Sequence, residues 1–221
     1  MFRDRAEAAF VLAHQLKPLK ITNGIIMAIP RGGVPIGSII AQQLDLPLDL
    51  AMSKKIGHPG NPEFAIGSVT LDDLVLDGDA ARLPQTFLTA EVRKIREDIL
   101  KKYNRFTKGS KPPSVEGKDV VLVDDGLATG NTMFASIESL RKQKPHSIIV
   151  AVPVSSIAAA AKIKLVADQF VCLEVSKTFY GVGEFYEDFS EVPDQMVIDL
   201  LAHTNSGEVS SHYKYSFNGV P

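Results

Sequence analysis

The sequence predicts an α/β fold, with a Rossmann-like parallel sheet of about five strands flanked by helices and a small hood or hairpin subdomain. Two observations predict it. Short apolar segments, of the kind found in strands buried on both faces, alternate with segments whose apolar residues have helical spacing. The chain has 221 residues of balanced composition and a formal net charge of -2, which suits one domain of ordinary size.

The expected elements follow one another in a regular order. Strands are expected at 24–30, 48–53, 120–123, 147–152 and 168–175, and helices at 34–44, 86–106, 132–142 and 156–164. Residues 63–77 alternate around a turn at Asp72-Asp73, which predicts a hairpin. The segment 107–118 is rich in Lys, Pro, Gly and Ser, which is typical of a loop.

These elements predict one domain over 1–203. We expect its core at about 20–175, an insert at about 57–118, and a hood or closing segment at about 176–203. Residues 204–221 are polar with little periodicity, which predicts a mobile tail.

The composition excludes several classes of protein. The nearly neutral charge argues against a nucleic-acid surface or a polybasic membrane patch, and no apolar run approaches the ~20 residues of a bilayer span. The first five residues lack the apolar core of a signal peptide. The single cysteine, Cys172, cannot form an internal disulfide and lies in an apolar run, as core cysteines do. We therefore expect a soluble cytoplasmic protein with no nucleic-acid or membrane partner.

The most informative segment begins with an apolar run, Val120–Val123, that leads directly into Asp124 and Asp125. Ligands bind at the carboxyl ends of strands in parallel sheets, and the glycines and hydroxyls that follow suit a phosphate at the start of a helix. Carboxylates accept hydrogen bonds from neighbouring hydroxyls or face a hydrated cation. The alternative is an acidic helix cap without a ligand, but a cap requires one Asp rather than two. A Walker loop is excluded, because the required Gly and Lys spacing is missing.

This segment, Val-Val-Leu-Val-Asp-Asp-Gly-Leu-Ala-Thr-Gly-Asn-Thr, resembles the phosphoribosyl diphosphate (PRPP) binding motif of the type I phosphoribosyltransferases. The resemblance implies that Asp124 and Asp125 bind the ribose hydroxyls. It implies that the 5′-phosphate lies against the loop residues Leu127, Ala128, Thr129, Gly130, Asn131 and Thr132, and that Gly126 also belongs to the substrate-binding loop. It also implies Mg²⁺ as cofactor, carried by PRPP near the acidic pair, with no protein ligand of the metal assigned.

A second candidate segment, Pro30-Arg31-Gly32-Gly33, ends the first expected strand and opens the first helix, so we expect it at the same end of the sheet as Asp124. Arg31 supplies a guanidinium suited to phosphate oxygens, and Gly32 and Gly33 allow backbone N–H groups to face an anion. The position resembles the family's diphosphate loop, which implies a non-proline cis peptide near Arg31-Gly32. The alternative is a tight strand-to-helix turn with a surface arginine.

Two lysines follow the second strand, and in the family a basic residue there reaches the diphosphate. Neighbouring residues of a strand face opposite sides, so only one of Lys54 and Lys55 reaches the ligand, and we favour Lys54. Asp124, Asp125, Arg31 and Lys54 form the expected catalytic set. The segment Gly57–Gly67 contains Gly-Asn-Pro-Glu-Phe, which together with Arg-Gly-Gly resembles a less characterised bacterial branch of the family.

The acceptor site is expected in the aromatic segment after the last strand. There Phe179 and Tyr180 offer rings that would stack on a base, and the alternative is aromatic packing of a small lobe. The loop carries Ala128 where the 6-oxopurine enzymes have an Asp, so the loop does not identify the acceptor.

The leading hypothesis is transfer of 5-phosphoribosyl from PRPP to a nitrogenous, nucleobase-like acceptor with release of diphosphate. The alternative is a non-catalytic PRPP-binding regulator or accessory protein of the same fold. A hydrolase lacks support, because no Gly-x-Ser-x-Gly turn occurs. The family is often dimeric, which implies a homodimer.

Overall fold

The structure is a computed structural model that describes residues 1–71, 73–76 and 78–206, without the side chains of Pro62, Glu63 and Ala65. Asp72, half of the predicted Asp72-Asp73 turn, lies outside the described residues, as does the expected tail from 207 on. No helix among the described residues is long and apolar enough to span a bilayer.

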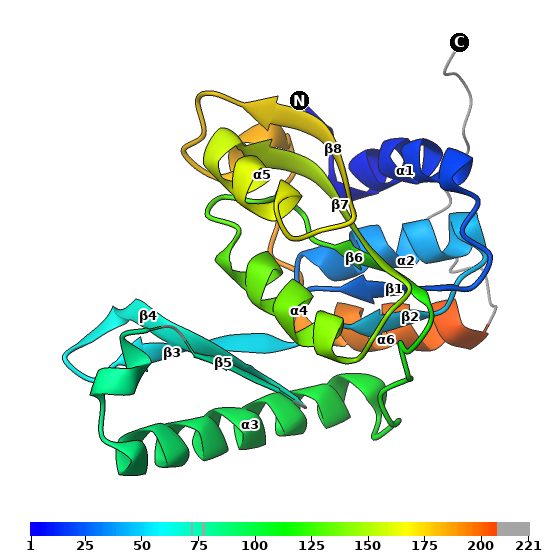
Figure 1. Cartoon of the computed structure of the whole chain (residues 1–221). Helices are drawn as coiled ribbons and strands as arrows, with labels where there is room; N and C mark the ends of the chain where they lie inside the picture. The colour runs from blue at the N-terminus through cyan, green and yellow to red at the C-terminus, as the bar shows by residue number, and fades with distance from the viewer. Residues whose placement is uncertain (72, 77, 207–221) are drawn as a thin grey trace.

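The main sheet has five strands in the order β2-β1-β6-β7-β8, and every neighbouring pair is parallel (Figure 1). The predicted parallel sheet is therefore confirmed. Its strands are β1 (Gly24–Ala28), β2 (Leu48–Leu50), β6 (Asp119–Val123), β7 (Ser147–Ser156) and β8 (Gln169–Ser176).

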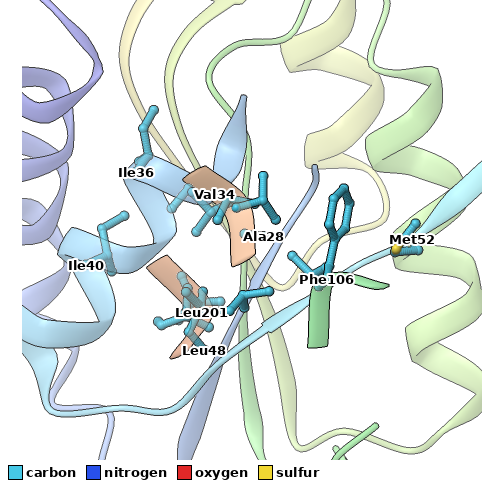
Figure 2. Close-up of a cluster of buried hydrophobic side chains, with 14 of the residues drawn as sticks. Ala28, Val34, Ile36, Ile40, Leu48, Met52, Phe106 and Leu201 are labelled. Atoms are coloured by element: carbon cyan, nitrogen blue, oxygen red, sulfur yellow. The ribbon is translucent and has the colours of Figure 1, made fainter. Parts of the chain in front are cut away.

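Helices cover both faces of this sheet because the strand side chains alternate between two cores. Ile26 and Val121 pack in one core with α1 (Arg5–Leu16), α2 (Gly33–Leu44) and α6 (Asp194–Ser206). Met27 and Leu122 pack in the other core with α4 (Asn131–Lys142) and α5 (Ile157–Lys164). Figure 2 shows part of the first core, where Ala28 and Leu48 of the sheet lie among side chains from α2 and α6.

A second, antiparallel sheet contains β3 (Ser53–His58), β4 (Asn61–Thr70) and β5 (Leu74–Leu76). It lies beside the long helix α3 (Gln85–Thr107), away from most of the main sheet (Figure 1). The predicted strand at 48–53 is wrong, because it joins two strands: the parallel strand ends at Leu50 and Ser53 already begins the antiparallel sheet. The buried, apolar Ala51 and Met52 between them hide this boundary in the sequence.

Helices α1 and α6 were not expected. The Asp4 carboxylate caps α1 by accepting from the Glu7 N–H at 2.8 Å, and the Glu7 carboxylate accepts from the N–H of Arg3, the residue before the cap, at 2.6 Å. The tail expected from 204 begins instead as the last turn of α6, where the Asn205 side chain pairs with the backbone N–H and C=O of Leu48. Three short 3₁₀ helices complete the described chain: η1 (Lys17–Leu19), η2 (Ala80–Arg82) and η3 (Val182–Phe185).

Candidate active site

The carboxyl ends of β1 and β6 bring the two predicted segments together. Ala28 pairs with Val123, and the N–H of Ile29 donates to the Val123 carbonyl at 2.9 Å. The turn that follows β1 therefore lies beside the acidic pair that follows β6. The non-proline cis peptide lies between Pro30 and Arg31, one bond earlier than expected.

The two glycines of this turn allow α2 to approach the acidic pair closely. A Cβ on Gly32 would lie 1.9 Å from Oδ2 of Asp125, and a Cβ on Gly33 would lie 2.7 Å from the carbonyl oxygen of Val123. The expectation of a free N–H at Gly33 is wrong, because this group donates to the Ile29 carbonyl at 3.0 Å. The glycines thus make room for Asp125 and for the end of β6.

Asp124 and Asp125 occupy a poorly solvated site. Oδ1 of Asp124 accepts from the Asp125 N–H at 2.9 Å. Burial raises the pKa of Asp124 well above its usual range, and the charge of Asp125 raises it further. Burial also raises the pKa of Asp125, against the opposing charge of Arg5. The phenol of Tyr186 donates to the Asp125 carbonyl at 2.7 Å, so the closing segment contacts this turn directly.

Arg31 is paired with carboxylates from the closing segment and the start of α6. It forms an ion pair with Glu191 and another with Asp194 at 3.4 Å, and Arg105 also contacts Asp194 at 2.9 Å. The hydrogen bond from Arg31 to Glu191 is the largest of the effects that raise the pKa of the guanidinium. The predicted diphosphate cation thus lies at the expected edge, but carboxylates hold it there.

The loop after the acidic pair divides into a buried part and an exposed part. Leu127 has no free backbone N–H to offer a phosphate, because its N–H donates to the Val154 carbonyl at 2.9 Å and its own carbonyl accepts from the Ser156 N–H. A Cβ on Gly126 would lie 2.6 Å from Val182, so this glycine serves packing. Gly130 has a φ of +70°, the left-handed conformation that glycine adopts most easily.

The exposed part of the loop is where an anion has access. Ala128, Thr129, Asn131 and Thr132 are exposed at the start of α4, where the first N–H groups have no partner within the helix. This arrangement suits a phosphate. One loop side chain is already engaged, because Lys162 of α5 donates to Oδ1 of Asn131 at 2.7 Å.

Lys54 faces the same region as the two loops. It lines a pocket of about 270 Å³ together with Pro30 of the β1 turn and Thr132 of α4. Asp98 and Lys102 of α3 also line it, and Asp98 accepts from Lys54 at 3.4 Å. Lys55 is exposed and does not line this pocket.

The aromatic segment differs from its expected role. The ring of Phe179 packs against Phe185 with centroids 5.1 Å apart, and Tyr180 is 85 % exposed. Neither ring lines the pocket beside Lys54. Phe179 therefore stabilises the closing segment by aromatic packing, and stacking of either ring on an acceptor has no support in this arrangement.

Sequence reasoning missed four charged groups that pair with the predicted residues, namely Arg5, Asp98, Glu191 and Asp194. Arg5 follows the Asp4 cap, and an Asp followed three residues later by Glu7 is a sequence signal for the start of the helix that carries Arg5. No local pattern indicates the partners of these side chains, since each pair joins segments far apart in the chain.

Comparisons with known proteins agree with this architecture. A solved structure of TT1426 from Thermus thermophilus is 39 % identical, with a TM-score of 0.83, and the match covers 91 % of this chain and 97 % of that one. The AQ2163 protein from Aquifex aeolicus shares the fold, with a TM-score of 0.51 at 13 % identity over 89 % of this chain and 82 % of that one.

Two curated proteins from strains of Mycobacterium tuberculosis, provisionally named as phosphoribosyl transferases, are 32 % identical over 96 % of this chain. The chain spans about half of their length, 49 %. The family model described as the phosphoribosyl transferase domain matches residues 5–190. A match over most of the chain, on a parallel sheet whose β6 end carries the acidic pair, shows that this protein belongs to the phosphoribosyl transferase domain family.

Proposed function

We propose that this chain binds PRPP at the carboxyl edge of β1 and β6 and transfers its 5-phosphoribosyl group to a nitrogen of a small, nucleobase-like acceptor, with release of diphosphate. The observation that carries the proposal is the pairing of Ala28 with Val123. This pairing brings the turn that carries Arg31 beside Asp124 and Asp125, and it supports the proposal that the two turns bind one substrate.

Each part of the donor has a group suited to it. Asp124 and Asp125 would accept from the ribose hydroxyls. The first N–H groups of α4, with Thr129 and Thr132, would hold the 5′-phosphate. Arg31 and Lys54 would neutralise the diphosphate, because fixed cations at a developing negative charge are the main way to stabilise such a leaving group.

The residues at this edge suit a Mg²⁺ ion that binds together with the phosphates of the substrate. Within the described residues no group of three or more His, Cys, Asp or Glu could hold a metal ion. Mg²⁺ is commonly bound through one or two carboxylates together with substrate phosphates, and Asp124 and Asp125 are the carboxylates that follow β6 at this edge. When bound, the ion would supply positive charge to the departing diphosphate.

The proposed reaction exchanges one bond at the anomeric carbon of the ribose for another. The bond from the anomeric carbon to the diphosphate oxygen breaks, a bond from that carbon to the acceptor nitrogen forms, and the nitrogen loses a proton. The protein would hold the two reactants in place and keep water from the sugar.

The test is a diphosphate-release assay with PRPP, Mg²⁺ and a panel of purines, pyrimidines and small amines. Release with at least one acceptor is expected. Binding of PRPP without release by any acceptor would favour the regulator hypothesis instead. The proposal fails if PRPP does not bind and replacement of both aspartates by asparagine changes nothing measurable.

The ion pair between Arg31 and Glu191 predicts that loss of the Glu191 charge tightens the binding of PRPP. Glu191→Gln should increase the affinity for PRPP by about two- to fivefold, because Arg31 no longer has to exchange an exposed ion pair for the diphosphate. The effect should shrink at high salt, which screens such pairs. Titration calorimetry at low and high ionic strength measures it.

Glu187→Gln is the matched control, since Glu187 is exposed in the same segment and its side chain forms no ion pair in the described part of the chain. An equal gain in both variants would point to net charge rather than to Arg31.

A further inference from the structure

Arg5 contacts the acidic pair from a helix that lies 120 residues earlier in the chain. Its Nε and one terminal nitrogen donate to Oδ2 of Asp125 at 2.9 and 2.8 Å. Both side chains are shielded, with exposed fractions of 12 % for Arg5 and 14 % for Asp125. A shielded, doubly hydrogen-bonded ion pair restricts the orientation of both groups.

The contacts of this carboxylate are asymmetric. Among the described residues, Oδ2 of Asp125 accepts both of the side-chain hydrogen bonds to this carboxylate. The same oxygen lies 1.9 Å from where a Cβ on Gly32 would be, against 3.0 Å for Oδ1. Oδ2 is therefore enclosed by Arg5 and Gly32, and Oδ1 keeps its capacity to accept a hydrogen bond.

The Arg5 guanidinium is itself held in place by the closing segment. A terminal nitrogen donates to the Ser190 carbonyl at 2.8 Å, and the guanidinium carbon lies 3.9 Å from the centre of the Phe189 ring. The Phe189 ring in turn stacks on Tyr186, whose phenol donates to the Asp125 carbonyl. Contacts of Arg5 and Tyr186 thus connect α1, the turn with the acidic pair and the closing segment to one another.

We propose that Arg5 is a positioning residue of the donor site, which holds Oδ2 of Asp125 so that Oδ1 faces a hydroxyl of the ribose. This inference rests on the proposed function, because it assigns the free oxygen to the sugar of PRPP. The role of Arg5 is to orient Asp125, and the reacting atoms need not touch Arg5.

The test compares three variants in their binding of PRPP and of diphosphate alone, both with Mg²⁺. Arg5→Gln should weaken PRPP binding about tenfold or more, the size expected when a charge-assisted contact loses its geometry. Diphosphate carries no ribose, so its affinity should stay within about twofold. Arg5→Lys keeps the charge but not the two-donor geometry and should recover part of the loss.

The matched control is Arg3→Gln. Arg3 lies two residues away, just before α1, and within the described residues its side chain forms an ion pair with Glu7 alone; this side chain is 63 % exposed. It should bind both ligands like the unchanged protein.

The outcomes separate the two proposals. If the unchanged protein binds no PRPP, the proposed function fails and this inference fails with it. If it binds PRPP and Arg5→Gln binds equally well, only the role of Arg5 is overturned. An equal loss for PRPP and diphosphate would also overturn it, since it would indicate general damage. If Arg5→Gln does not fold, the ratio of the two affinities in Arg5→Lys decides: an unchanged ratio overturns the positioning role.

Discussion

Asp124→Asn is expected to stabilise the protein at neutral pH while it weakens PRPP binding by about ten- to a hundredfold. The binding loss follows because an amide is a poorer acceptor for a sugar hydroxyl than a carboxylate is. The gain in stability follows because burial and the neighbouring charge of Asp125 raise the pKa of Asp124 in the folded protein. A buried carboxylate without an opposite charge of its own is costly, and a gain on the order of 1 kcal/mol is expected.

The raised pKa of Asp124 makes the stability of the folded protein depend on pH. Between the unfolded pKa, near 4, and the raised folded pKa, the folded protein holds a proton that the unfolded chain has released. The free energy of unfolding therefore falls as pH rises through this window, and the full cost of the buried charge is present above it. Asparagine removes this dependence, so the advantage of the variant should be largest at neutral pH and vanish toward pH ~4.

Urea unfolding over a pH series, with calorimetry of PRPP binding, measures both effects. Asp119→Asn is the matched control, because Asp119 lies at the opposite end of the same strand, where it accepts from the Ser147 hydroxyl at 2.6 Å. It should leave PRPP binding unchanged. The assignment of Asp124 to the ribose is contradicted if Asp124→Asn binds PRPP as tightly as the unchanged protein.

Gly32→Ala is expected to have the second large effect, although the backbone of Gly32 suits alanine. Its φ of -61° and ψ of -33° are helical values that alanine adopts without strain. The added Cβ would lie 1.9 Å from Oδ2 of Asp125, so that carboxylate must move and lose its contacts with Arg5. We expect a loss of about 1–3 kcal/mol in the free energy of unfolding, as for other overpacked sites, and at least about a tenfold loss in PRPP affinity.

Chemical unfolding and PRPP titration of the variant test this expectation. Gly78→Ala is the control, because a Cβ at that position would meet no atom within 4 Å among the described residues beyond its chain neighbours. Unchanged stability and affinity in Gly32→Ala would mean that Asp125 does not need the space beside Gly32.

Much of the fold and one half of the site are predictable from local sequence. The run Val120–Val123 is apolar because its strand is buried on both faces, and the residues after it have the turn chemistry of a ligand-binding loop. Because parallel strands present their carboxyl ends at one edge, the Arg31 turn and the acidic pair were expected there together, and β1 and β6 are neighbours.

Backbone hydrogen bonds of the loops were harder to predict. Gly33 and Leu127 have the right position for phosphate contacts, but their N–H groups bond to Ile29 and Val154. Sequence patterns predict which residues enter a loop. Which N–H groups remain free depends on the neighbouring strand, which is decided only when the sheet has formed.

By itself, the sequence determined the order of the main strands and helices, the acidic pair at the end of its strand and the nearby cationic turn, since these depend on periodicity and turn chemistry over a few residues. Only the tertiary structure decided which charges meet. Arg5 reaches Asp125, and Glu191 and Asp194 hold Arg31, because α1, α6 and the closing segment pack around one edge of the sheet. Such ion pairs join side chains that are far apart in the chain, so no pattern over a few neighbouring residues predicts them.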